Sequence, residues 1–230
     1  MTTIDSLNRF LEIQIQEWRQ NNKEPKPLKR GPVIAVSRKP GCDADLVARA
    51  LAEELGLVVY DSKIVEAIAR DAQVSEKVVA TLEDHFRSDL DDWLDSLNLD
   101  PVLSNDGYLH CLRKILFTIA THGSAIIMGR GANFLLPPDK RTLGLFLVAP
   151  LEMRVKNIMG SLDLSRKMAQ KHLAHMEREQ RLWVKKFGCA DLNDATNYHL
   201  VINTALVTPG AIVQIVKEIL HDAGNHEEHS

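Results

Sequence analysis

The sequence contains few cysteines and few aromatic residues, and it has no long apolar run. Its three cysteines lie far apart, without CxxC or Cys/His ligand spacing, which argues against a disulfide framework and a zinc site. The longest apolar stretch, 143–151, contains Gly144 and Pro150 and is shorter than the roughly 18 residues that a membrane span needs. The first ten residues lack the basic and apolar segments of a secretory signal. We therefore expect a cytoplasmic protein without a membrane partner.

An excess of basic residues is also missing. Lys and Arg total 28 against 31 Asp and Glu, and a net charge of −3 does not favour nucleic acid as a partner. The 45% hydrophobic and 26% charged fractions are those of a soluble globular protein, so long-range disorder is not its main state. The tail 223–230 is expected to be disordered, and no metal site is expected at its histidines.

The first 31 residues are predicted to form an appendage. Residues 5–20 carry apolar side chains at a helical period, which predicts an amphipathic helix. The polar segment 21–32 follows with three prolines and is typical of a linker. The helix is expected to pack on the main domain or on a second subunit, so a homodimer through it is one possibility.

The main domain, 32–222, alternates short apolar runs with helical patterns. A β-rich run at 32–36, a helix at 43–55, a second strand at 57–60 and a helix capped by Asp61 or Ser62 predict a parallel sheet. Residues 75–120 are predicted to be helical, with Ser75 as an N-cap. Further strands are expected at 125–129, 143–149 and 200–203, and the run 143–149 is apolar on both faces, as in a central strand.

The first strand is followed by the loop Ser37-Arg38-Lys39-Pro40-Gly41-Cys42-Asp43-Ala44. A strand, a glycine turn and a helix N-terminus form the usual geometry for binding phosphate, because backbone N–H groups and the helix dipole converge there. This loop lacks the GxxxxGK[ST] pattern and carries Asp43 and Asp45. Asp43 could instead be the N-cap of the helix, with its carboxylate in the place of a phosphate. Both interpretations stay open, and Arg38 and Lys39 slightly favour the first.

Two further segments are candidates for phosphate chemistry. Arg130 lies between two glycines after a buried strand, where its planar guanidinium can face the ligand crevice, although a pairing with a carboxylate is the alternative. On the helix predicted around 165–187, one stripe is basic and the opposite one is apolar. The apolar stripe comprises Ala169, Leu173, Met176, Trp183 and Phe187. The basic stripe is either a solvated face or part of a lid, and it comprises Lys167, Lys171, Arg178, Arg181 and Lys185.

Five segments, in this order, resemble the cytidylate kinase-like family of P-loop nucleoside monophosphate kinases: VIAVSRKPG, GLVVYDSKIVEAIA, AIIMGRGANFLL, LFLVAPLEMRVKNIM and YHLVINTALVTPGAIV. The resemblance covers about residues 32–218. It implies an α/β, three-layer P-loop kinase fold with a parallel five-stranded sheet flanked by helices. It also implies a helical NMP-binding region at 62–122 and a lid at 151–187. The implied activity is transfer of the ATP γ-phosphoryl, with Mg²⁺, to CMP, dCMP or a similar monophosphate.

The resemblance also implies roles for single residues. The family loop S-R-E-x-G-S-G-G is matched at Ser37, Arg38 and Gly41, whereas Cys42 replaces a serine and Asp43 and Ala44 replace the two glycines, which makes the loop degenerate. The implied ATP-binding residues are Ser37, Arg38, Lys39, Gly41, Cys42, Asp43 and Ala44. Arg130 corresponds to the arginine that holds the acceptor phosphate, and Asp61 to an aspartate near magnesium and acceptor. The arginines implied to cover the transferring phosphoryl group are Arg154, Arg178 and Arg181.

Asp43 and Ala44 keep a second function open. A catalytically inactive module that binds a nucleotide or a phosphometabolite and regulates a partner would tolerate both departures. A scaffold that binds no nucleotide is a third interpretation. The sequence does not identify the acceptor base, because the side chains that read it would lie in the helical region 62–122.

Overall fold

The computed structural model describes residues 3–21, 31–96, 107–137, 139, 141–186 and 191–225. The chain divides into two compact units. The helical unit comprises Met1–Gly31 and Asp61–Gly123, and the sheet unit comprises Pro32–Tyr60 and Ser124–Ser230. No helix among the described residues is long and apolar enough to cross a membrane.

The sheet unit is built on five parallel strands in the order β2-β3-β1-β4-β5. Both the parallel sheet and its five strands confirm the prediction, and the interior position of β4 explains why its residues are apolar on both faces. Val36 of β1 pairs with Met128 on one side and with Leu145 on the other. The strand bounds are β1 Val33–Arg38, β2 Val58–Tyr60, β3 Ala125–Met128, β4 Thr142–Val148 and β5 Leu200–Asn203.

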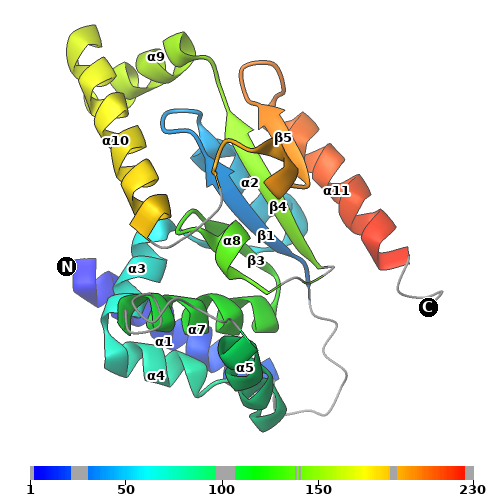
Figure 1. Cartoon of the computed structure of the whole chain (residues 1–230). Helices are drawn as coiled ribbons and strands as arrows, with labels where there is room; N and C mark the ends of the chain where they lie inside the picture. The colour runs from blue at the N-terminus through cyan, green and yellow to red at the C-terminus, as the bar shows by residue number, and fades with distance from the viewer. Residues whose placement is uncertain are drawn as a thin grey trace. The chain divides into compact units, whose positions relative to one another are not determined.

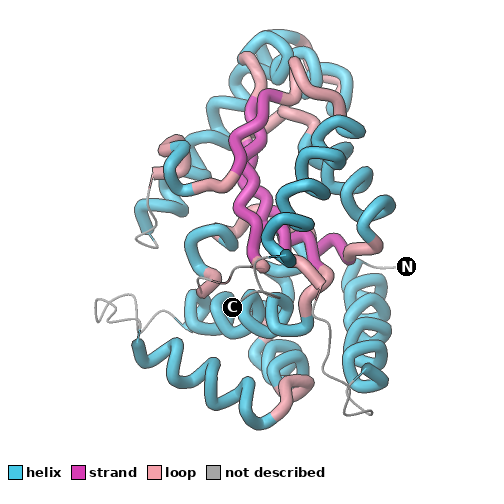
Figure 2. The backbone as a smooth tube through the Cα atoms, turned by 90° about the vertical axis from the view of Figure 1, so that its right-hand side faces the viewer, coloured by secondary structure: helices cyan, strands magenta, loops and turns pink. Residues whose placement is uncertain are grey.

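Helices flank this sheet on both sides (Figures 1 and 2). Two of them, α2 (Ala44–Leu55) and α11 (Pro209–Asn225), join β1, β3, β4 and β5 in one apolar core. Burial of each large apolar side chain there contributes roughly 1.5–3 kcal/mol. The other helices of the unit are α8 (Ala132–Leu135), α9 (Leu151–Leu162), α10 (Arg166–Lys186) and the 3-10 turn η1 (Ala195–Asn197).

The helical unit contains α1 (Thr3–Asn21), α3 (Ser62–Arg70), α4 (Ala72–Val79), α5 (Asp84–Ser96) and α7 (Gly107–His122). Asp61 caps α3, as predicted, and accepts hydrogen bonds from the amides of Lys63 and Ile64 at 2.7 and 2.9 Å. The predicted N-cap Ser75 is wrong. Asp71 caps α4 instead, because its extended backbone lets one carboxylate oxygen accept from the next free amides, and Ser75 is buried inside the helix.

The predicted N-terminal helix is present, and the C-terminal helix is longer than predicted. The predicted N-terminal helix is present as α1, and its Leu11 is only 4% exposed, so this apolar side chain is already covered within the chain. Most of the predicted linker, residues 22–30, lies outside the described residues. At the other end α11 continues to Asn225, three residues into the tail predicted to be disordered, and residues 226–230 lie outside the described part.

Candidate functional site

The loop between β1 and α2 has a backbone that suits glycine at two positions. Gly41 has φ +81°, and a Cβ built there would lie 2.8 Å from the carbonyl oxygen of Arg154, so only glycine fits. Asp43 has φ 55°, which is also left-handed and which aspartate tolerates better than most side chains. The sequence therefore departs from a glycine-rich loop at Asp43, whereas the backbone keeps the conformation that glycine favours.

Two side chains of α9 hold loop carbonyls from one side. Arg154 donates from Nη1 to the carbonyl oxygen of Pro40 at 3.3 Å. Asn157, three residues further along the same helix, donates from Nδ2 to the carbonyl oxygen of Gly41 at 2.9 Å. The spacing of three puts both side chains on one face of α9, which is the face toward the loop.

Two more loop carbonyls are held by other elements. Gln180 of α10 donates from Nε2 to the carbonyl oxygen of Arg38 at 3.1 Å. Thr204, directly after β5, has its Oγ1 2.9 Å from the carbonyl oxygen of Cys42 and 3.2 Å from that of Val148. No pattern in the sequence predicts the contacts of Asn157 and Gln180 with the loop. The spacing of Asn157 from Arg154 was the one signal that could have pointed to it.

The interpretation of Asp43 as a capping carboxylate is wrong. Asp43 stands at the N-cap position of α2, but its side chain makes no capping hydrogen bond. Its left-handed backbone turns the carboxylate away from the first amides of the helix, and Oδ2 accepts from Asn157 Nδ2 at 2.6 Å. Burial raises the pKa of this carboxyl group above its ordinary value; the hydrogen bond from Asn157 opposes the shift and the charge of Asp45 adds to it.

Cys42 and Ala44 face the core. Cys42 is 1% exposed, and its thiol lies 3.4 Å from the carbonyl oxygen of Leu147. Burial raises the pKa of the thiol to about 11, so Cys42 is protonated at neutral pH and acts as a small apolar side chain. Ala44 is the first residue of α2 and is 4% exposed. Both side chains therefore anchor the loop to the core.

Arg154 is buried between three partners. Besides Pro40, it donates from Nε to the carbonyl oxygen of Ala149 at 3.1 Å, and its Nη1 forms an ion pair with Glu177 Oε1 of α10 at 2.7 Å. The side chain of Arg154 is 10% exposed and that of Glu177 is 27% exposed. Arg154 therefore joins the loop, the end of β4 and α10.

A basic pocket of about 340 Å³ lies beside the loop. Four of the cationic residues singled out above line it, together with Glu177 and Asp191; they are Arg38, Lys39, Arg181 and Lys185. Lys39 Nζ donates to Asn193 Oδ1 in this pocket. Ser37 is buried at the end of β1. The structure thus places Arg181 beside the loop cations, whereas Arg178 is exposed on α10 and does not line the pocket.

The predicted apolar stripe of α10 holds only in part. Ala169 and Leu173 are buried, and they pack with Val155 and Ile158 of α9. Met176 is 37% exposed, contrary to the prediction. Phe187, the last residue of the predicted stripe, lies outside the described residues.

Arg130 has a strained backbone. It has φ 50° between Gly129 at φ 74° and Gly131 at φ 64°, so three successive residues are left-handed. A left-handed conformation costs arginine about 1–2 kcal/mol relative to glycine. A Cβ at Gly131 would lie 2.7 Å from the ring of Trp183, so the tryptophan closes over this turn. Strain of this kind is often kept at functional positions.

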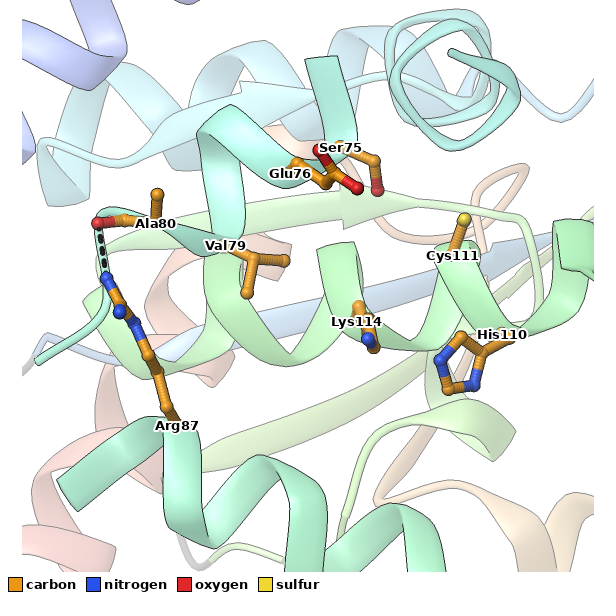
Figure 3. Close-up of a pocket in the computed structure, with 8 residues that line it drawn as sticks. All are labelled: Ser75, Glu76, Val79, Ala80, Arg87, His110, Cys111 and Lys114. Atoms are coloured by element: carbon orange, nitrogen blue, oxygen red, sulfur yellow. Dashed lines mark hydrogen bonds between the residues drawn. The ribbon is translucent and has the colours of Figure 1, made fainter. Parts of the chain in front are cut away.

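The helical unit has a pocket of its own, of about 410 Å³ (Figure 3). Arg87 of α5 reaches across to donate from Nη2 to the carbonyl oxygen of Ala80 at 2.9 Å. His110 and Lys114 lie one turn apart on α7. The pKa of His110 is lowered by burial first and then by Lys114 and Arg113, so its neutral form prevails at pH 7. The lining residues are Ser75, Glu76, Val79, Ala80, Arg87, His110, Cys111 and Lys114.

No group of three or more His, Cys, Asp or Glu that could hold a metal ion occurs among the residues that the structure describes. Magnesium in kinases is bound by one or two carboxylates together with substrate phosphates, so such a site is completed by the nucleotide.

Comparisons with known proteins place this geometry in a family. A cytidylate kinase from Ignicoccus hospitalis is 26% identical over 188 residues, which cover 82% of this chain and 98% of that protein. A cytidylate kinase from Aeropyrum pernix is 27% identical over 185 residues, covering 80% and 95%. The crystal structure of an uncharacterized protein from Eubacterium ventriosum has the same fold, with a TM-score of 0.65 at 19% identity, and it covers 84% of this chain and 99% of that one. The sequence pattern of the Cytidylate kinase-like family matches residues 33–206, and the chain belongs to this family.

Proposed function

We propose that this protein transfers the γ-phosphoryl group of ATP to a nucleoside monophosphate, with CMP or dCMP as the acceptor. The family and the fold support a nucleoside monophosphate kinase-like function. The observation that carries the proposal is the loop itself. Its backbone is left-handed at Gly41 and Asp43, and its carbonyls at Arg38, Pro40 and Gly41 are bound by side chains.

In the proposed reaction, an oxygen of the acceptor phosphate forms a bond to the γ-phosphorus. The bond between that phosphorus and the β–γ bridging oxygen breaks, and the products are ADP and a nucleoside diphosphate. No covalent enzyme intermediate is needed, because such catalysis is positioning plus neutralisation of charge. Magnesium, when bound with the nucleotide, neutralises charge on the donor phosphates.

The loop residues have separate roles in this proposal. The backbone amides of Gly41 and Asp43 bind the donor phosphates, as amides at helix N-termini do. Arg38 and Lys39, which line the basic pocket, replace in part the lysine that the loop lacks. Ser37, Cys42 and Ala44 anchor the loop through their burial.

The remaining cations act on the phosphates from other elements. Arg130 holds the acceptor phosphate, because a planar guanidinium can donate two parallel hydrogen bonds to it. Arg181, beside the basic pocket, covers the transferring phosphoryl group together with Arg178 when α10 closes over the nucleotide. Arg154 acts through the loop instead, because its guanidinium is bound to Pro40, Ala149 and Glu177. The role of Asp61 beside magnesium or the acceptor rests on the sequence alone, since the structure shows it as a helix cap.

One observation favours the second function, a nucleotide-binding module without catalysis. The Asp43 carboxylate stands in the loop and repels a phosphate at neutral pH, when it is ionised. An inactive relative that binds a less charged ligand would tolerate this repulsion.

Product analysis separates the two functions. Wild-type protein is incubated with ATP, Mg²⁺ and one of CMP, dCMP, UMP or AMP, and nucleotides are resolved by ion-exchange chromatography. The proposal expects ADP and the matching nucleoside diphosphate in equal amounts, fastest with CMP or dCMP. Binding of ATP without any diphosphate formed from the acceptor would favour the regulatory function and contradict the proposal.

A further inference from the structure

The peptide planes of the loop carry information about where its amides point. In one peptide plane the carbonyl of a residue and the N–H of the next residue point in opposite directions. The bond from Arg154 to the Pro40 carbonyl therefore sets the direction of the Gly41 amide. In the same way, the bond from Thr204 to the Cys42 carbonyl sets the direction of the Asp43 amide.

The amides of Gly41 and Asp43 differ from those of their loop neighbours Lys39 and Cys42. The Lys39 amide donates to the carbonyl of Leu147 at 2.9 Å, and the Cys42 amide donates to the carbonyl of Lys39 at 3.3 Å. For the amides of Gly41 and Asp43, the described residues offer no hydrogen-bond acceptor. Because a backbone N–H is an obligatory donor, both amides are suited to an anion.

Asn157 constrains the peptide plane that lies between the two held by Arg154 and Thr204. Its one amide group donates both to the Gly41 carbonyl at 2.9 Å and to the Asp43 carboxylate at 2.6 Å. It thereby fixes the peptide plane between Gly41 and Cys42, and it also draws the carboxylate of Asp43 toward α9. With the carboxylate bound there, its negative charge lies on the side of the carbonyls rather than on the side of the amides.

We infer that Thr204 and Asn157 are positioning residues for the donor phosphates: Thr204 holds the Cys42 carbonyl so that the Asp43 amide faces the anion, and Asn157 holds the Gly41 carbonyl and the Asp43 carboxylate on the opposite side. The inference rests on the proposed function. Neither residue touches the phosphates, and each acts through the loop backbone. Their contribution is selective, because it concerns the phosphates of the nucleotide and leaves the binding of its nucleoside part unchanged.

The test compares variants that keep or remove a single donor. Thr204→Val has nearly the shape of threonine but lacks the hydroxyl, whereas Thr204→Ser keeps the hydroxyl and loses a methyl group. Asn157→Leu keeps the approximate size of the side chain and removes both hydrogen bonds. Gln170→Ala, on the exposed face of α10, is the matched control, because it removes an amide side chain for which no hydrogen bond is found among the described residues.

The measurements are calorimetric dissociation constants for MgATP and for adenosine, together with the melting temperature of each variant. Weakening of one hydrogen bond between a loop amide and a charged phosphate predicts that Thr204→Val and Asn157→Leu each bind MgATP roughly ten-fold more weakly. Adenosine affinity is expected to stay the same, and Thr204→Ser and Gln170→Ala are expected to bind MgATP with nearly wild-type affinity.

The other possible results overturn either the inference about Asn157 and Thr204 or the proposed function. Unchanged MgATP affinity in folded Thr204→Val and Asn157→Leu overturns the inference and leaves the proposed function standing. Equal weakening of MgATP and adenosine, with a lower melting temperature, shows a purely structural role and also overturns it. Should Asn157→Leu fail to fold, the pair Thr204→Val and Thr204→Ser decides alone. A wild-type protein that binds neither ligand removes the proposed function itself.

Discussion

Asn157 and Asp43, 114 residues apart in the chain, are joined by a hydrogen bond of 2.6 Å from Nδ2 to Oδ2. This contact explains how an acidic residue occupies a loop whose backbone suits glycine. The left-handed conformation of Asp43 directs the carboxylate to α9, and Asn157 offers a donor there. The loop therefore keeps its turn, and its amides stay apart from the negative charge.

Replacing Asp43 by glycine should tighten ATP binding. The substitution removes a negative charge near the phosphates and relieves a left-handed backbone, while Asn157 can still bind the Gly41 carbonyl. Partly exposed charge pairs are worth about 1 kcal/mol, so the affinity should rise several-fold. Calorimetry with MgATP measures it, and Asp45→Asn, at an exposed position two residues away, is the control for net charge. Equal or weaker affinity in folded Asp43→Gly would show that the loop is not the donor site.

The effect of Asp43→Asn on stability should depend on pH. The folded-state pKa of Asp43 is raised above its ordinary 3.8, so its contribution to stability is full below that value and is lost as pH rises through the folded pKa. Asparagine does not titrate and avoids this loss. The free energy of unfolding of Asp43→Asn relative to wild type should therefore be higher at pH 7 than at pH 3.5. Urea titrations at both values measure it, and a difference that stays constant or reverses contradicts the environment described for this carboxyl group.

Much of the fold could be predicted because its signals are local. Apolar runs such as 143–149 mark buried parallel strands, and Asp61 caps the helix that begins one residue later. Ser75 was misassigned as a cap because Asp71, four residues earlier, is an equally good capping residue, and only the actual start of α4 distinguishes them.

The site could be predicted only in outline. The loop could be located because a glycine turn lies between a strand and a helix. The side chains that donate hydrogen bonds to its carbonyls come from α9, α10 and the end of β5. Such contacts join residues more than a hundred positions apart, and no local pattern encodes them. Asp43 could be interpreted as a cap for the same reason, because its partner Asn157 is too far along the chain for a local pattern to indicate the contact.

Cys42 should resist alkylation at pH 8. Its thiol is 1% exposed and has a pKa of about 11, which leaves only about one thiolate in a thousand at this pH. Cys111, which is half-buried on α7, should react with iodoacetamide before Cys42 does. Peptide mass mapping over a time course separates the two, and faster modification of Cys42 than of Cys111 would contradict the buried placement of the loop.

Arg130→Lys should weaken monophosphate binding selectively. Lysine keeps the positive charge, and the left-handed backbone costs lysine as much as arginine. Its ammonium group, however, cannot donate two parallel hydrogen bonds to a phosphate. Loss of a charged hydrogen bond costs about 1.5–3 kcal/mol, so CMP affinity should fall roughly ten- to a hundred-fold. Affinity for cytidine should not change. Arg49→Lys, exposed on α2, is the matched control. If Arg130→Lys lowers the melting temperature and leaves CMP affinity intact, Arg130 is structural.

The central claim is that the loop from Ser37 to Ala44 holds the donor phosphates. A crystal structure of the wild-type protein with CMP, Mg²⁺ and a non-hydrolysable ATP analogue tests it most directly. The account predicts that the triphosphate lies against the amides of Gly41 and Asp43, with the Asp43 carboxylate still bound to Asn157. A triphosphate found elsewhere, or a loop whose carbonyls face the nucleotide, would contradict it.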